Sequence, residues 1–502
     1  MDKTERVHQL ISGSGRAYFL SRPRRFGKSL LCSTLGAVFE GRRELFGEIA
    51  GRPALAINCL DWEWKKHPVI RLDLNPGDYT AGTIVLTAGL NNQLNNVART
   101  YGIELRGQLV ADQFTNLIKD LNEKFNEKVV VIIDEYDKPL IGTMDMPELH
   151  IQMRNTLKGF YGILKSCDSY LRFVLLTGVS KFSHVSIFSD LNHLADLTLD
   201  PRYADLCGIT QEEMEENFKP EIDGILEVTG RERSIYLDNL KRFYNGYRFS
   251  KKQIKVYNPF GLLYHFDRSG DFLPYWYETG TPTFLINLII KQKINILNLN
   301  NMHVAFESFS KYDIENMDAA PLLYQTGYLT IVDYDEKRNQ FTLDYPNEEV
   351  RSSFANSLIK QYLQLSGAKA DSLVVKLQNA IYDGEVDELI ETLRIYLSSL
   401  PYDIIKETEN YYQSVIHMIF TLLGFNCRSE VRIAGGRIDT LVETDQFVYC
   451  FEFKLNGTAK EALAQINTKE YTLPWKGSGK KLFKIGVEFD REKRNIGEWA
   501  VG

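Results

Sequence analysis

Three residues near the C-terminus have the types and spacing needed to hydrolyse a phosphodiester bond. Glu452 and Lys454 are two positions apart in an apolar stretch, and Asp439 lies about a dozen residues upstream. Carboxylates are the ligands that bring Mg²⁺ to a scissile phosphate, and a lysine beside the metal positions the attacking water. We therefore expect Asp439 and Glu452 to bind a metal and Lys454 to act as the activating cation. An exposed hairpin with an ordinary Glu–Lys surface pair is the alternative, and it would be preferred without Asp439.

The three side chains converge only if two strands pair in the right register. The segments 436–439 and 449–454 read as neighbouring strands of a hairpin that turns around Asp445. With two or four residues outside the ladder, Asp439 falls directly opposite Glu452 on the same face of the sheet. An odd number would turn the aspartate to the other face unless a bulge corrected it.

Helices are expected on both sides of this hairpin. Downstream, Thr458 and Glu461 form a capping box, and the helix that they start carries Gln465. His417, in the upstream helix, is interpreted as a core or supporting histidine rather than a ligand. The upstream helix begins at Glu409 and has apolar residues at helical spacing, namely Tyr412, Val415, Ile416, Ile419, Phe420 and Leu423.

A second candidate site lies near the N-terminus, between a short apolar strand and a helix. Gly27, Lys28 and Ser29 supply the second half of a phosphate-binding loop: a glycine at a helix N-terminus, a lysine for the β- and γ-phosphates, and a hydroxyl for Mg²⁺. Arg22 occupies the place of the usual first glycine. On this loop alone, a nucleotide site and a basic surface turn are equally good interpretations.

Two further strand ends favour the nucleotide site. The apolar run 129–133 predicts a strand in the middle of a parallel sheet, and Asp134 and Glu135 end it. There Asp134 would hold Mg²⁺ through water, and Glu135 would orient the attacking water. The next strand, 173–176, is followed by Thr177, Ser180 and Lys181, where a residue that senses the γ-phosphate would lie, although strand ends are commonly polar.

The elements around these residues predict several domains. Strands alternate with amphipathic helices up to about residue 210, which is typical of a doubly wound α/β domain. Residues 211–370 read as an aromatic-rich helical region. Within it, a hairpin at 328–345 followed by a helix suggests a winged helix or, equally, a hairpin that only packs domains together. Linking helices are expected over 371–400, and a second α/β domain over 401–502.

Composition limits the remaining possibilities. The 502 residues carry a net charge of −7, so nucleic-acid binding requires a local basic patch. The six cysteines are scattered, which predicts reduced thiols in a cytoplasmic protein rather than a disulfide framework or a zinc site. No apolar run approaches the roughly 20 residues that span a bilayer.

The chain resembles a known family over nearly its whole length. Four motifs look like those of the bacterial AAA-ATPase-like proteins, in which an arginine at the first glycine position is usual: FLSRPRRFGKS at 19–29, IDEYD at 133–137, TGVSK at 177–181 and YNGY at 244–247. The segment from Glu409 to Tyr471 resembles the PD-(D/E)XK nuclease-like domain that commonly follows. The fold implied is a P-loop NTPase domain with a parallel sheet, a helical or winged-helix-like middle region and an α/β restriction-endonuclease-like domain.

The resemblance also implies roles for individual residues. In the C-terminal domain Asp439, Glu452 and Lys454 would carry catalysis, with a contribution from Gln465, and Glu409 and Glu430 are candidate additional carboxylates. The resemblance assigns no arginine finger, and Arg202 is only a guess for that role. In the N-terminal domain Ser29 and Asp134 would hold Mg²⁺, Glu135 would be catalytic, and ATP would be bound by Arg24, Arg25, Gly27, Lys28, Ser29, Asp134 and Thr177.

The functional hypothesis is an ATP-binding and ATP-hydrolysing protein whose Mg²⁺-dependent nuclease domain acts on nucleic acid, with DNA expected as the partner. The alternative is an ATP-dependent regulatory switch whose C-terminal domain binds nucleic acid or a protein without cleaving. The acidic net charge and the lack of an obvious arginine finger favour this alternative. A membrane partner is not expected, and self-assembly into a homo-oligomer stays open.

Overall fold

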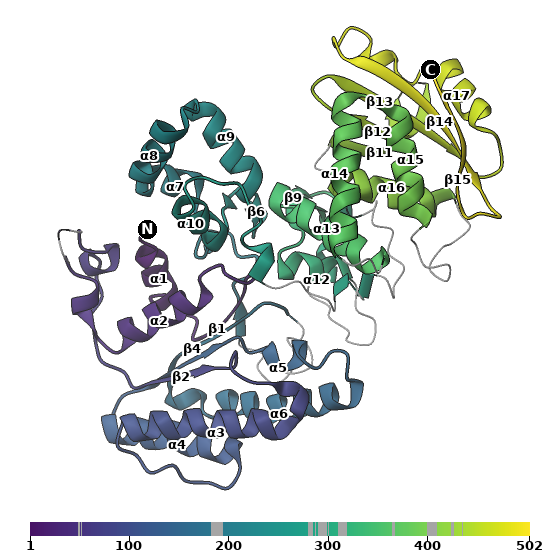
Figure 1. Ribbon diagram of the computed structural model, residues 1–502. Helices are drawn as coiled ribbons and strands as arrows, with labels where there is room; N and C mark the ends of the chain where they lie inside the picture. Colours follow the sequence, from purple (N-terminus) through teal and green to yellow (C-terminus); the bar gives the residue numbers. More distant parts are fainter. Residues whose placement is uncertain are drawn as a thin grey trace. The chain divides into compact units, whose positions relative to one another are not determined.

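The computed structural model describes residues 1–48, 51, 53–181, 194–279, 285–286, 288–289, 299, 301–309, 319–363, 367–398, 409–422, 426–433 and 435–502. These residues form two compact units (Figure 1). The first comprises Met1–Trp276 and Asn301–Asn347, and the second comprises Tyr277–Asn300 and Glu348–Gly502.

A five-stranded parallel sheet organises the first unit. Its strand order is β2-β3-β4-β1-β5, with β3 and β4 inside the sheet. All six residues of β3 are buried, which confirms that the apolar run 129–133 forms an interior parallel strand. The strands are β1 Ala17–Ser21, β2 Val69–Asp73, β3 Val129–Asp134, β4 Leu171–Gly178 and β5 Leu194–Asp196.

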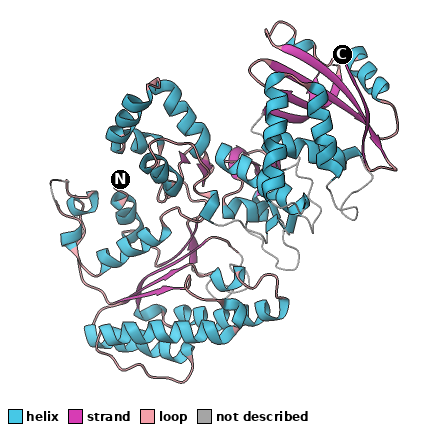
Figure 2. Ribbon diagram, in the orientation of Figure 1, coloured by secondary structure: helices cyan, strands magenta, loops and turns pink. Residues whose placement is uncertain are grey.

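Helices pack against this sheet to give a layered α/β arrangement (Figures 1 and 2). α2 contacts β2, β3 and β4, whereas α3, α4 and α6 pack on one another and share one apolar core with the sheet. The helices are α1 Thr4–Ile11, α2 Lys28–Phe39, α3 Thr83–Thr100, α4 Val110–Phe125, α5 Lys138–Ile141 and α6 Pro147–Ser166.

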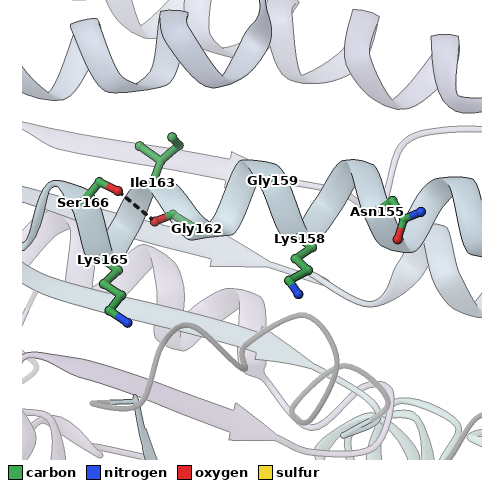
Figure 3. Close-up of a pocket in the computed structure, with 7 residues that line it drawn as sticks. All are labelled: Asn155, Lys158, Gly159, Gly162, Ile163, Lys165 and Ser166. Atoms are coloured by element: carbon green, nitrogen blue, oxygen red, sulfur yellow. Dashed lines mark hydrogen bonds between the residues drawn. The ribbon is translucent and has the colours of Figure 1, made fainter.

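The outer face of α6 borders a shallow hollow of about 630 Å³ (Figure 3). Gly159 and Gly162 leave the helix backbone open there, and Lys158 and Lys165 extend from it. The lining contains no acidic or nucleophilic cluster, and the hollow includes none of the residues assigned to chemistry above.

The part of the first unit that follows the sheet is helical. α7, α8, α9 and α10 enclose a second apolar core rich in aromatic side chains. A two-stranded ladder of β6 and β7 joins α9 to α10. The bounds are α7 Gln211–Asn217, α8 Lys219–Thr229, α9 Arg233–Tyr244, β6 Tyr247–Arg248, β7 Lys255–Val256 and α10 Pro259–Asp267.

The hairpin predicted at 328–345 is present, and the burial of the preceding helix bears on whether this region could bind DNA. β9 (Thr330–Asp335) and β10 (Gln340–Asp344) pair in antiparallel fashion, and β8 (Met302–Ala305) adds a third strand. All eight residues of α12 (Ala319–Thr326), which precedes the hairpin, are buried. A recognition helix must expose one face to enter a DNA groove. The burial of α12 therefore favours the packing interpretation over a DNA-reading winged helix.

The second unit contains a mixed five-stranded sheet of order β11-β12-β13-β14-β15. β13 and β14 are parallel, and the other neighbours are antiparallel. α16 and α17 pack on this sheet. The elements are α13 Glu348–Leu363, α14 Gly367–Asp383, α15 Val386–Ser398, α16 Glu409–Leu422, β11 Asn426–Ile433, β12 Gly436–Glu443, β13 Phe447–Lys454, α17 Ala459–Thr468, β14 Lys481–Asp490 and β15 Asn495–Val501.

The chain is therefore α/β, with a parallel sheet first, a helical middle region and a mixed sheet at its end. The predicted boundaries near 210, 370 and 400 stay predictions. All six cysteines are free thiols, four of them buried, as expected. Within the described ranges, no helix is both long enough and apolar enough to cross a bilayer.

Candidate functional site

The loop between β1 and α2 has the backbone of an anion cradle. Gly27 caps the N-terminus of α2 with φ of 88°, a left-handed conformation that glycine adopts without strain. Lys28 and Ser29 form the first turn of the helix, where backbone N–H groups and the helix dipole favour negative charge. An ATP phosphate group fits the chemistry of this position.

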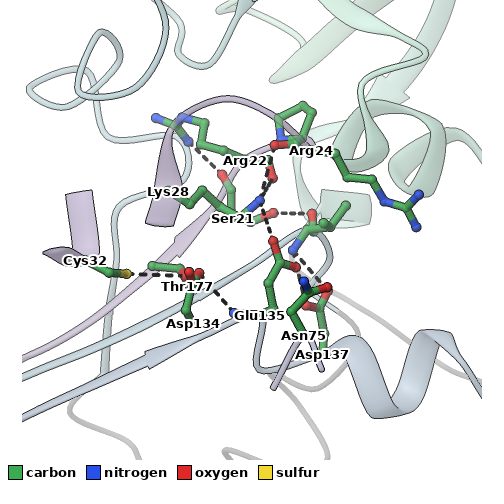
Figure 4. Close-up of polar contacts among 12 residues, drawn as sticks. Ser21, Arg22, Arg24, Lys28, Cys32, Asn75, Asp134, Glu135, Asp137 and Thr177 are labelled. Atoms are coloured by element: carbon green, nitrogen blue, oxygen red, sulfur yellow. Dashed lines mark hydrogen bonds and ion pairs between the residues drawn. The ribbon is translucent and has the colours of Figure 1, made fainter. Parts of the chain in front are cut away.

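Arg22 turns into the protein interior instead of toward this cradle (Figure 4). Its side chain is fully buried, donates to the carbonyl oxygens of Ser21, Thr198 and Tyr203 at 2.8–3.0 Å, and lies over the ring of Phe249. Burial lowers the pKa of Arg22 from its ordinary value. The arginine at the first glycine position is thus a structural support rather than a phosphate ligand.

Lys28 is buried and bonds to its own loop. Its Nζ donates to the carbonyl oxygens of Arg22 at 3.1 Å and Pro23 at 3.3 Å. The same atom lies 3.2 Å from Glu135 Oε1 (Figure 4). Lys28 and Glu135, which were both assigned to the nucleotide site from the sequence, therefore lie in one place.

Carboxylates gather at the carboxyl ends of the strands. Asp134 is almost fully buried, and its Oδ1 accepts from Thr177 Oγ1 at 2.5 Å. Glu135 has φ of 53°, a strained value for a side-chain-bearing residue that often marks functional sites. Asp73, which pairs with Asp134 in the β2–β3 register, was not singled out from the sequence. Burial and the charges of Asp134 and Glu135 raise the pKa of Asp73.

The loop after β4 is held by carboxylates. Ser180 donates to Asp137 Oδ2 through its backbone N–H at 2.6 Å and its hydroxyl at 2.7 Å. Burial and the charge of Glu135 raise the pKa of Asp137 to about 6. Lys181 Nζ pairs with Asp196 at 2.5 Å. Burial opposes the charge of Asp196, but this ion pair prevails and lowers its pKa.

The other three arginines named from the sequence, Arg24, Arg25 and Arg202, differ in their contacts and exposure. The carbonyl oxygen of Arg24 accepts from Trp276 Nε1 at 3.0 Å, so the middle region helps to shape the loop. Arg25 is exposed, has φ of 63°, and its guanidinium lies 5.0 Å from the ring centroid of Phe260. Arg202 is exposed and paired with Asp200 at 2.6 Å, which raises its pKa.

In the second unit, the hairpin has the even loop that the candidate metal site needs. β12 and β13 pair Thr440 with Phe451 and Glu443 with Val448, which leaves four residues in the turn. Continuing this register by one position brings Asp439 opposite Glu452. Phe453 N–H donates to Asp439 Oδ2 at 2.9 Å, in agreement with this alignment.

Glu452 is the centre of the polar contacts at this place. It is 2% exposed, and its Oε1 accepts from Lys454 Nζ at 3.2 Å and from the side-chain amide of Gln465 on α17. Tyr471 Oη lies 3.2 Å from the same amide nitrogen. The structure therefore brings Glu452, Lys454 and Gln465 together.

Gln413 is a supporting residue that the sequence did not reveal. It is buried on α16, and its Nε2 donates to the backbone oxygen of Asp439 at 2.7 Å. The only signal in the sequence is a polar residue beside apolar helix positions, which carries no information about its partner. Burial and the nearby charges of Glu452 and Asp439 raise the pKa of Cys450 to about 12.

The donor set fits Mg²⁺, which commonly uses one or two protein carboxylates and keeps several waters. Among the described residues, no group of three or more His, Cys, Asp or Glu side chains is suited to a metal. Glu430 is exposed and pairs with Arg437 at 3.1 Å, and the side chain of Glu409 lies outside the described residues. His417 is buried, bonds to Ser429 at 2.6 Å, and burial lowers its pKa to about 4, which suits a core position.

Comparisons with known proteins agree with this division of the chain. Residues 1–188 match the model of a predicted AAA-ATPase, and residues 407–499 match the PD-(D/E)XK nuclease superfamily. An uncharacterized protein in the vnfD 5′ region of Azotobacter chroococcum mcd 1 is 34% identical over 520 residues, covering 100% of this chain and 95% of that protein. The ORC2 protein of Aeropyrum pernix, solved as ADPNP–ADP complexes, is 12% identical with a TM-score of 0.27, and the match covers 68% of this chain and 87% of that one. The chain belongs to the family of AAA-ATPase-like proteins that carry a C-terminal PD-(D/E)XK nuclease superfamily domain.

Proposed function

We propose that this protein is an ATPase whose C-terminal domain hydrolyses phosphodiester bonds in nucleic acid, with DNA as the expected substrate. The observation that carries the proposal is the hairpin register, which aligns Asp439 with Glu452 while Lys454 lies 3.2 Å from Glu452. A surface Glu–Lys pair would not explain why Glu452 is 2% exposed and Asp439 7% exposed.

In this proposal Asp439 and Glu452 hold Mg²⁺, which supplies charge stabilisation at the scissile phosphate and a more acidic bound water. Lys454 positions the attacking water and offsets the negative charge that develops on the phosphate. Gln465 holds the Glu452 carboxylate in place, and Gln413 holds the backbone at Asp439.

For the ATPase, Lys28 binds the phosphates at the N-terminus of α2. Ser29 and Asp134 hold Mg²⁺, with Thr177 fixing Asp134 through its hydroxyl. Glu135 orients the attacking water, a role that requires it to leave Lys28 when the phosphates take over that lysine. Gly27 allows the turn, and Arg24 and Arg25 line the loop.

A cleavage assay tests the nuclease. The full-length protein is incubated with plasmid, linear duplex, single-stranded DNA and RNA, with Mg²⁺ and with ATP, a non-hydrolysable analogue or neither. Lys454→Ala should lower cleavage by about 10²-fold or more, whereas Lys460→Ala, at an exposed position of the same domain, should not. Equal inactivity of the wild type and Lys454→Ala on every substrate would refute the nuclease.

The second candidate function is a switch that binds ATP and does not turn it over. The pairing of exposed Arg202 with Asp200 favours it. An arginine that already pairs with a neighbouring carboxylate is poorly suited to act as an arginine finger on the phosphates of ATP. Tight ATP binding with negligible turnover would support the switch, and multiple turnovers that Glu135→Gln abolishes would reject it.

A further inference from the structure

The last turn of α12 touches the loop that follows β4. Gln325 Oε1 accepts the backbone N–H of Lys181 at 2.8 Å, although the two residues are 144 positions apart. Lys181 ends the segment 177–181, whose first residue, Thr177, bonds to Asp134. Gln325 thus restrains the segment 177–181, whose first residue contacts the proposed Mg²⁺ ligand.

The same turn touches the phosphate loop. Gly327 directly follows the helix with φ of 91°, and a Cβ at this position would lie 2.8 Å from Cβ of Pro23. The ring of Tyr328 packs 5.5 Å from that of Trp276, whose indole N–H donates to the carbonyl of Arg24. The two halves of the candidate nucleotide site therefore share one neighbour, the end of α12.

The amide of Gln325 sits in an environment that would suit an apolar side chain. Gln325 is 3% exposed, and its Nε2 has no hydrogen-bond partner among the described residues. Leaving a buried donor unsatisfied costs stability. A methionine would fill similar space without this cost, so the bond to Lys181 is the contribution that distinguishes glutamine here.

The same C-terminal end of α12 leads directly into the β9–β10 hairpin. Thr330 Oγ1 accepts the backbone N–H of Arg248 at 2.8 Å, and the carbonyl of Val332 accepts from Arg248 Nη1 at 3.1 Å. Arg248 is 1% exposed, so this junction is anchored inside the first unit. The segment 177–181 is therefore connected, through the C-terminal end of α12, to a hairpin whose first strand is anchored at its start.

We infer that Gln325 is a positioning residue that lets the nucleotide site discriminate ATP from ADP. It holds the loop 177–181 in the arrangement that responds to the γ-phosphate, and it couples that loop to the hairpin through α12. A nucleotide can change the arrangement of the loop 177–181 only if it binds one arrangement more tightly than another. The coupling must therefore appear as a ratio between the affinities for the ATP analogue and for ADP. The inference rests on the proposed nucleotide binding.

The test compares Gln325→Met with Thr326→Val in the full-length protein. Thr326 is also buried in α12, but within the described part of the chain its hydroxyl bonds only to the carbonyls of Leu322 and Leu323 in its own helix. Calorimetric titration with Mg²⁺ gives the affinities for ADP and for a non-hydrolysable ATP analogue. Gln325→Met should reduce the preference for the triphosphate by about 5-fold or more, with the ADP affinity nearly unchanged, and Thr326→Val should retain the preference.

An unchanged preference in Gln325→Met, or an equal loss in Thr326→Val, would overturn the inference while leaving nucleotide binding intact. A wild type that binds neither nucleotide would instead overturn the proposed function. Should Gln325→Met fail to fold, hydrogen exchange on the wild type decides the question. The analogue, but not ADP, should slow exchange in residues 177–181 and 319–335 together, and protection of the first segment alone would refute the coupling.

Discussion

Lys28 Nζ and Glu135 Oε1 lie 3.2 Å apart, so the cation of the phosphate loop and the candidate catalytic carboxylate form an ion pair in this structure. Lys28 is 4% exposed, and a buried cation requires such a partner. ATP phosphates would compete with Glu135 for the lysine. Binding of the nucleotide and release of the carboxylate are therefore expected to be one event.

The first prediction concerns this pair. Glu135→Gln removes the competing charge, so it should leave ATP binding equal or tighter while reducing turnover by about 10²-fold or more. Lys28→Ala should instead abolish binding, because it removes the phosphate ligand and leaves Glu135 without its cation. Titration with a fluorescent ATP analogue, together with a phosphate-release assay, measures both effects. Undiminished turnover in Glu135→Gln would exclude the residue as the group that orients water.

The second prediction concerns the aspartate of the candidate metal site. Asp439→Asn should abolish Mg²⁺-dependent cleavage, because an amide is a much weaker ligand for a hard cation. Stability should change by less than about 1 kcal/mol, since the asparagine oxygen can still accept the Phe453 N–H. Asp445→Asn, at an exposed position in the turn of the same hairpin, is the matched control. Comparable cleavage by both variants would remove Asp439 from the site.

The third prediction concerns the approach of α17 to its sheet. A Cβ on Gly486 would lie 2.3 Å from the carbonyl oxygen of Ala459 and 2.6 Å from the backbone nitrogen of Leu463. Gly486→Ala should therefore push α17 away, cost about 1–3 kcal/mol and impair cleavage, because α17 carries Gln465. Gly497→Ala, where the nearest atom would be 3.5 Å away, should be tolerated. Urea unfolding and the cleavage assay report the two effects, and full activity of Gly486→Ala would show that Gln465 is dispensable.

The fourth prediction concerns pH and the helical part of the first unit. Burial lowers the pKa of His265 to about 4, and the neutral ring donates from Nδ1 to the Asp271 carbonyl and accepts from the Tyr236 hydroxyl at Nε2. The unfolded chain takes up a proton near pH 6.5, whereas the folded ring does so only near pH 4. Its contribution to stability is complete above about pH 6.5 and decreases as the pH falls toward 4, by up to about 3 kcal/mol.

Unfolding free energies of the wild type and His265→Gln between pH 7 and pH 4 measure this contribution. The unfolding free energy of the variant should depend less steeply on pH, because unfolding of the variant takes up about one proton fewer over that window. His417, in the second unit, also has a pKa lowered to about 4 and remains in the variant, so some dependence should persist. Parallel curves for the two proteins would show that His265 does not titrate as proposed.

Local patterns were sufficient to predict much of the fold. The run 129–133 is apolar on both faces, and it forms an interior strand because only a parallel sheet covered by helices buries both faces. The alignment of Asp439 with Glu452 was predicted conditionally, because the alternation of side chains is certain while the number of turn residues is not. The four-residue turn met the condition.

Other features were beyond sequence reasoning because they depend on contacts between distant positions. The inward direction of Arg22 requires carbonyls at Thr198 and Tyr203, and no local spacing reveals them. Gln413 and Gln325 look like ordinary polar residues of helices until their partners, 26 and 144 positions away, are known. The residues Asp73 and Asp137 were also not assigned, because single carboxylates at strand ends are common.

The support of the phosphate loop by distant residues has a consequence for how the protein is made. The loop reaches its shape through Phe249, Asn258 and Trp276, and the last of these is 252 positions from the carbonyl that it binds. A fragment that stops at residue 210 would keep every residue of the loop and lose these contacts. During synthesis on the ribosome, the phosphate loop would lack these contacts until Trp276 has emerged. The nascent N-terminal domain would therefore be unable to bind a nucleotide before that point.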